Sequence, residues 1–160
     1  MRHRRYRALA CAAATVLAAF GWSHSARAAE LSVVAEKLRS LEGWVHLALW
    51  DRADGFTEAE SALIRTELPV TAGRVRFDLG DLEPGRYAVV IFHDENGNGA
   101  FDRTWIGLPA EGLGFSNGAW IGLGPPSFKE AAFELSQDPQ EVVVSLRYPE
   151  DDPAERAHRP

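Results

Sequence analysis

Cysteine is nearly absent from this sequence, since the only one among its 160 residues is Cys11. It lies in an N-terminal stretch that we expect to be removed during export. The remaining chain then has no thiol, which excludes disulfide bonds and thiolate chemistry. Packing, or a metal ion held by other side chains, must supply any additional stabilisation.

A long hydrophobic run is also missing, because the apolar stretch at residues 8–20 is shorter than the roughly 20 residues that span a bilayer. Arginines precede it at positions 2, 4, 5 and 7, and Ala26, Arg27 and Ala28 follow it. This order is typical of a secretory signal peptide with an Ala-x-Ala cleavage site. We therefore predict a signal peptide over residues 1–28, cleavage after Ala28, and a periplasmic or secreted protein without a transmembrane segment in its mature chain.

Basic residues are scarce outside this leader. Five of the 17 basic residues and none of the 23 acidic ones lie in residues 1–28, which leaves 12 against 23 and a formal charge of −11. Such a charge disfavours nucleic acid as a partner. The length predicts one domain over residues 29–149. Residues 150–160 are polar and proline-containing, which predicts a disordered acidic tail.

Convincing long helices are absent, whereas short apolar or alternating segments recur. Four segments are predicted as strands: residues 44–50, 74–79, 87–92 and 141–148. Turn-forming residues separate them at 51–55 and at Pro84 and Gly85, so an antiparallel β-sandwich is the expected architecture. Tyr87 follows the second turn and either ties that corner through its hydroxyl or is merely half-buried. Residues 31–41 fit helical spacing and strand alternation about equally.

One long segment, residues 103–128, shows no periodicity. It has six glycines, three prolines and four large aromatic residues. Loops of this length are functional or disordered, and the aromatic residues argue against disorder. At its end, Ser127 and Glu130 predict a capping box for a short helical turn.

Oxygen-bearing side chains recur at every second residue directly after the strand at 87–92. With Asp94 in the first place of a calcium loop, the other expected ligands are Asn96 in the third, Asn98 in the fifth, the Ala100 carbonyl in the seventh and Asp102 in the ninth. A glycine stands sixth, where the backbone must turn sharply. Calcium takes six to eight such oxygens. This spacing predicts a calcium site that is structural rather than catalytic.

The twelfth place of this loop holds Trp105 instead of the bidentate glutamate of an EF-hand. Glu111, in the following segment, is the candidate for the missing carboxylate. With so few carboxylates we expect a dissociation constant of roughly 10⁻⁴ to 10⁻³ M. The alternative is that the two Asn-Gly pairs only form a hairpin turn. Glu95 lies between ligand places and is expected to point outward.

Other kinds of site have weaker signals. The histidines after residue 28 show no zinc-binding spacing, and no serine has a nucleophile-elbow setting. His93 is expected to be a packed strand-end residue rather than a general base. A sugar-binding or protein-binding surface could be formed by Trp44, His46 and Trp50, on one face of a predicted strand, with Trp105 and Trp120 from the long segment. The alternative, which we favour, is that the long segment covers these residues.

Four stretches together resemble the DUF2141 family of secreted or periplasmic bacterial proteins of unknown function. They are residues 82–89 (LEPGRYAV), 93–102 (HDENGNGAFD), 107–117 (GLPAEGLGFSN) and 124–131 (GPPSFKEA). The resemblance covers about residues 31–148. It implies a prealbumin-like (transthyretin/immunoglobulin-like) sandwich with a strand at 31–38, and it supplies no activity or catalytic residue.

The expected function is therefore a non-enzymatic binding or accessory module of the cell envelope, with calcium as a structural cofactor and an envelope protein or glycan as partner. Two alternatives stay open. One is a binder of carbohydrate or envelope polymer that uses surface tryptophans. The other is a hydrolase that uses the acidic loop.

Overall fold

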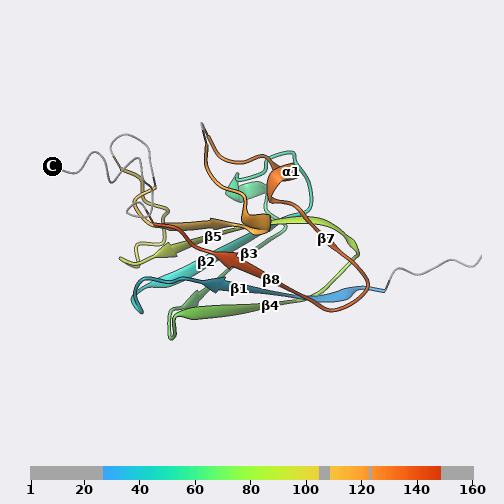
Figure 1. Cartoon of the computed structure of the whole chain (residues 1–160), viewed down its shortest axis with the longest axis horizontal. Coiled ribbons are helices and arrows are strands. Elements are labelled where there is room, and N and C mark those ends of the chain that lie inside the picture. The colour runs from blue at the N-terminus through green and yellow to red at the C-terminus, as the bar shows by residue number, and fades with distance from the viewer. Residues whose placement is uncertain (1–26, 105–108, 123, 149–160) are drawn as a thin grey trace, which may run out of the picture.

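The computed structural model describes residues 27–104, 109–122 and 124–148. Two β-sheets pack face to face (Figure 1), as expected for an all-β sandwich. The smaller sheet has the order β4–β1–β8, and the larger has the order β3–β2–β5–β6 with β7 also paired to β5. The predicted tail, Trp105 and nearly all of the predicted signal peptide lie outside the described residues.

Short helices accompany the strands. The strands are β1 (Ala29–Glu36), β2 (Trp44–Trp50), β3 (Ile64–Pro69), β4 (Arg74–Leu82), β5 (Gly85–Asp94), β6 (Gly112–Phe115), β7 (Phe133–Leu135) and β8 (Gln140–Ser145). The helices are η1 (Ala59–Ser61), η2 (Ser116–Gly118) and α1 (Phe128–Ala131). In the described part of the chain, no helix is long and apolar enough to cross a membrane.

Alternation along the strands builds the core between the sheets. On β2, Val45, Leu47 and Leu49 are almost fully buried, whereas the residues between them face the opposite side of the sheet. The same holds on β8, where Val142 and Val144 are buried and Val143 is exposed. The expected antiparallel arrangement needs one correction, because β1 and β8 run parallel. Nearly the whole domain connects these two strands, so no tight hairpin forces them to be antiparallel.

Residues 31–41, whose spacing fits both a helix and a strand, contribute to strand β1, as the family resemblance implies. Both of its faces are covered, since Ser32 and Val34 are buried like Leu31 and Val33. A strand buried on both faces loses its alternation, which explains the ambiguity of its sequence. Lys37 has a φ of 62°, and the strand ends there.

The long segment covers the outer face of the larger sheet instead of forming one continuous loop. It contributes strand β6 and a second apolar cluster with Phe115 and Phe128 in it. The predicted helical turn is confirmed as α1, with Ser127 and Glu130 forming the capping box. Buried Ser116 joins this cover to the sheet, because its Oγ accepts a hydrogen bond from the Val89 N–H at 2.8 Å and donates one to the Ala131 carbonyl at 2.6 Å.

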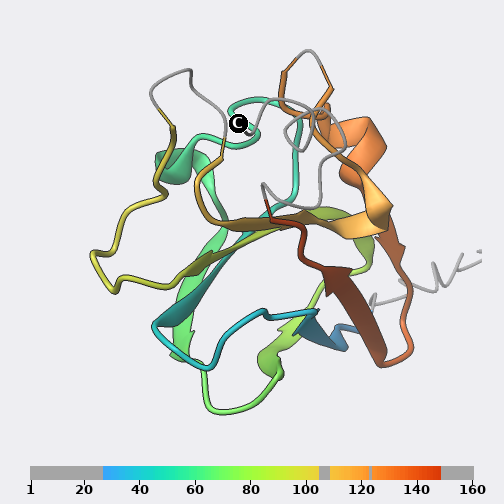
Figure 2. The ribbon, with the colours of Figure 1, turned by 60° about the vertical axis from the view of Figure 1, so that its left-hand side comes forward.

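The two sheets are joined at both sides. On one side β4 continues into β5, and the Tyr87 hydroxyl donates to the Glu83 carbonyl at 2.7 Å, which confirms the tyrosine tie at this corner. On the other side Leu113 and Arg147 form an antiparallel bridge with two hydrogen bonds of 2.9 Å. Strand β5 pairs with β2 on one side and β6 on the other, and the loop after β5 extends from one end of the larger sheet (Figure 2).

Candidate functional site

Asp94 ends strand β5 and organises the loop that follows. Its side chain is 1% exposed. One carboxylate oxygen accepts hydrogen bonds from the N–H groups of Gly97 at 2.8 Å and Asn98 at 3.2 Å, and the other accepts from Gly99 N–H at 2.7 Å. Burial acts to raise the pKa of Asp94, but these three N–H donors outweigh it and hold the pKa below the usual value.

The loop curls because its two glycines adopt left-handed backbone conformations. Gly97 has a φ of 70° and Gly99 has a φ of 76°, which side chains with a Cβ rarely adopt. The curl brings Asn96 and Asn98 to Asp102, whose Oδ2 accepts from their amide nitrogens at 2.7 and 3.0 Å. Four of the predicted ligand side chains therefore lie in one hydrogen-bonded loop. Ala100 belongs to it as well, because its N–H donates to Asn98 Oδ1 at 2.7 Å.

Glu111 returns to this loop although it lies nine positions after Asp102 in the sequence. The return is made by a bridge between Arg103 and Pro109 and by a hydrogen bond from Ala110 N–H to the Asp102 carbonyl at 2.9 Å. Because β6 pairs Gly112 with His93, the next residues in this register are Glu111 and Asp94, which then share the outer face.

The Glu111 carboxylate is buried with one oxygen unpaired. Glu111 is only 4% exposed, and its Oε2 accepts a hydrogen bond from Asp102 N–H at 3.1 Å. Oε1 has no hydrogen-bond partner among the residues that the structure describes. Burial raises the pKa of Glu111, and the nearby carboxylates of Asp94 and Asp102 raise it further. An unpaired carboxylate oxygen beside other acids is costly unless a proton or a cation accompanies it.

Glu95 and His93 lie beside the loop but point elsewhere. Glu95 pairs with Arg39 and accepts from Ser40 Oγ at 2.8 Å, as expected for a residue between ligand places. His93 is fully buried, with Nδ1 at 2.7 Å from the Tyr148 hydroxyl and Nε2 at 2.8 Å from the Glu42 carbonyl. This satisfied setting agrees with the prediction of a packed strand-end residue.

His46 is a neighbour of the site that the motif did not include. Its Nε2 lies 3.5 Å from Asp94 Oδ2, and its Nδ1 lies 3.0 Å from Glu67 Oε2. The ring stacks on Phe92 at 4.4 Å between centroids. The register of β2 with β5 pairs His46 with Phe92, so only the strand pairing, and no local spacing, could have placed it here.

The three tryptophans that the structure describes differ in exposure. Trp44 is 41% exposed, whereas Trp50 is buried and donates from Nε1 to Ser61 Oγ at 3.1 Å. Trp120 is half-buried, with the Arg147 guanidinium 4.7 Å from its ring. Phe56 and Ser61, in the segment after β2, contact Trp50, which belongs to the same apolar cluster as Phe115 and Phe128. Trp44 lies exposed at the other end of the same strand.

No group of three or more histidine, cysteine, aspartate or glutamate side chains that could hold a metal ion lies within residues 27–104, 109–122 and 124–148. Asp94, Asp102 and Glu111 therefore do not form a ready-made group of three carboxylates around one metal position. The amide oxygens of Asn96 and Asn98, which accept hydrogen bonds from Asn98 N–H and Ala100 N–H, are also a kind of oxygen that calcium accepts.

A family model described as an uncharacterized protein conserved in bacteria (DUF2141) matches residues 33–143. The chain belongs to the DUF2141 family. No curated protein and no solved structure matches it. In this DUF2141 chain the matched span begins inside β1 and ends inside β8, so it includes the whole Asp94–Asp102 loop and Glu111.

Proposed function

We propose that this DUF2141 protein is a non-enzymatic β-sandwich module of the bacterial envelope whose loop after β5 binds a structural calcium ion. The observation that carries the proposal is Glu111, a buried carboxylate with an unpaired Oε1 at the end of an otherwise hydrogen-bonded acidic loop. The expected ligands are Asp94, Asn96, Asn98, the Ala100 carbonyl, Asp102 and Glu111.

Calcium suits this donor set better than the common transition metals do. All the expected donors are oxygens, and they are a mixture of carboxylates, amides and a backbone carbonyl. Neutral amides also keep the number of charges low, which suits the modest affinity of calcium sites in extracellular modules. The asparagine amides and Asp102 hydrogen-bond to each other within the loop and hold these oxygen-bearing side chains together.

The position of the loop supports a structural role for the ion. Asp94 is the last residue of β5, and Glu111 directly precedes β6. An ion shared by the two carboxylates would fasten the ends of two adjacent strands together with the segment between them. An ion that binds only the folded form stabilises it by mass action.

Export is supported by the place at which the sheet begins. Strand β1 starts at Ala29, where the side chain is already buried and pairs with Leu82. Cleavage after Ala28 would therefore remove no residue of the sheet. The periplasm or the extracellular space would also expose the loop to calcium.

Differential scanning calorimetry of residues 29–160 tests the proposal. The chain is melted with calcium, with magnesium and with a calcium chelator, at matched ionic strength. We expect calcium to raise the melting midpoint above that in chelator, and magnesium to raise it less, because magnesium demands a smaller octahedral site. Equal midpoints in calcium and chelator would overturn the proposal.

A further inference from the structure

We propose that the outer face of the larger sheet binds a small amphipathic anion, with an apolar body in a pocket and its anionic group near Arg65 and Arg103. The pocket has a volume of about 630 Å³, within the usual range for small-molecule sites. It lies on the sheet face opposite the sandwich core.

The floor of the pocket is apolar. Residues that alternate with the core positions form it: Ala48 from β2, Val90 and Phe92 from β5, and Leu113 and Phe115 from β6. Phe101 and Ile121 add apolar walls, with the Phe101 ring 5.5 Å from that of Phe92. Ala48, Val90 and Phe92 are only half-buried, so an apolar ligand would remove further apolar surface from water.

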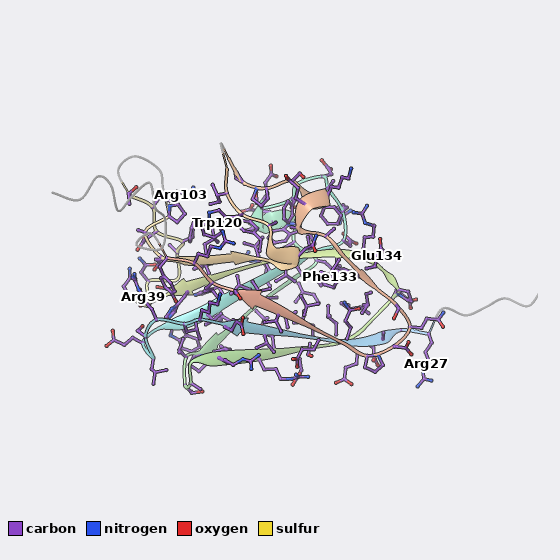
Figure 3. The ribbon with its side chains drawn as sticks, in the orientation of Figure 1. Arg27, Arg39, Arg103, Trp120, Phe133 and Glu134 are labelled. Atoms are coloured by element: carbon purple, nitrogen blue, oxygen red, sulfur yellow. The ribbon has the colours of Figure 1, made fainter. Side chains whose placement is uncertain are left out.

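Two arginines set the preferred charge of the ligand. Arg65 lies across from Ala48 on the edge strand β3, lines the pocket, and forms no ion pair with another described residue. Arg103 also lines the pocket, with its guanidinium 5.1 Å from the Phe101 ring, at the loop end of the molecule (Figure 3). The one acid in the lining, Glu67, already contacts His46. In a domain of strongly negative charge, this local pair of cations favours an anionic group.

Fluorescence titration of residues 29–160 with 8-anilinonaphthalene-1-sulfonate tests the inference, because this probe combines an aromatic body with one anionic group. We expect saturable binding that dodecanoate displaces and that dodecyltrimethylammonium displaces at least tenfold less well. Arg65→Gln and Arg103→Gln should each weaken binding by about two- to fivefold, as expected for partly solvated charge pairs. Arg74→Gln, on the other sheet, should leave it unchanged.

Ala48→Trp should fill the floor and weaken probe binding more than tenfold, with circular dichroism melting as the check that the variant folds. NMR shift mapping with dodecanoate on the unmodified chain provides a test that needs no variant. We expect the largest amide shifts at Val90, Phe92 and Leu113. Absence of saturable binding, equal displacement by the cationic surfactant, or shifts confined to another face would overturn the inference.

Discussion

Replacing Glu111 with glutamine should raise the stability of the chain without calcium and reduce the additional stability that calcium provides. Without calcium, the buried carboxylate with its unpaired Oε1 destabilises the folded chain. Glutamine removes the charge and keeps an oxygen that can accept from Asp102 N–H. We therefore expect Glu111→Gln to be more stable than the unmodified chain in chelator, by about 1–3 kcal/mol, the usual cost of a buried unsatisfied group.

With calcium, the same substitution removes one of the expected carboxylate ligands. At about 10 mM calcium, a dissociation constant of roughly 10⁻⁴ to 10⁻³ M stabilises the folded chain by about 1.4–2.7 kcal/mol. For a domain of this size that corresponds to a rise of roughly 5–10 °C in melting midpoint. If the loss of the carboxylate weakens binding by about tenfold or more, the rise should be at most about half as large.

Calorimetric melting of both chains in calcium and in chelator measures the two effects. Glu95→Gln is the matched control, because it makes the same chemical change in the same loop at a carboxylate that faces Arg39 and Ser40. This control should lower both midpoints slightly and keep the calcium-induced rise. The reasoning would be refuted if Glu111→Gln destabilised the chelated protein, or if its calcium-induced rise equalled that of the unmodified chain.

Two further substitutions test how the site is supported. Tyr148→Phe removes a hydroxyl that contacts His93 Nδ1 and accepts a hydrogen bond from Arg39 N–H. We expect it to lower the free energy of unfolding, measured in urea, by about 1–3 kcal/mol. The loss should be smaller for Tyr87→Phe, whose hydroxyl contacts one carbonyl. Equal losses for the two tyrosines would contradict this account. Ser116→Ala leaves the Val89 N–H without the hydroxyl that pairs with it and should cost about 1–3 kcal/mol. Amide exchange should then accelerate at Val89 and Ala132, and protection unchanged at both amides would argue against the link between β5 and α1.

Sequence alone predicts the strands that have one buried and one solvated face. Strand β8 and its continuation are an example, because Val142, Val144, Leu146 and Tyr148 alternate with exposed or half-buried residues. Such alternation reflects the local environment of each residue. It carries no information on strand order or direction, which is why the parallel pairing of β1 and β8 was not predicted.

Strands β3 and β6 were missed for physical reasons. Most residues of β3 are exposed, as befits an edge strand, so its alternation is weak. In β6, glycine is required by neighbours that are distant in sequence. A Cβ at Gly112 would lie 2.5 Å from the Tyr148 ring, and one at Gly114 would lie 2.8 Å from Val144 Cγ1. These glycines therefore resemble loop residues until the tertiary contacts are known.

Some residues of the candidate site are predictable from local spacing, whereas others depend on strand pairing. Regular spacing over nine residues predicts that Asp94, Asn96, Asn98 and Asp102 meet. The structure joins Asn96 and Asn98 to Asp102, whereas the Asp94 carboxylate accepts from backbone N–H groups of the same loop. Glu111 was inferred only from a missing ligand, and its return depends on the pairing of β5 with β6. The contact of His46 with Asp94 depends on the pairing of β2 with β5 and has no local signal.

The most direct test of the central claim is a crystal structure of residues 29–160 grown in calcium, with anomalous data collected at a long wavelength. The account predicts an anomalous peak inside the loop, with oxygens of Asp94, Asn96, Asn98, Ala100, Asp102 and Glu111 at about 2.3–2.6 Å from it. A loop without a peak, in which Glu111 Oε1 still has no partner, would contradict the claim.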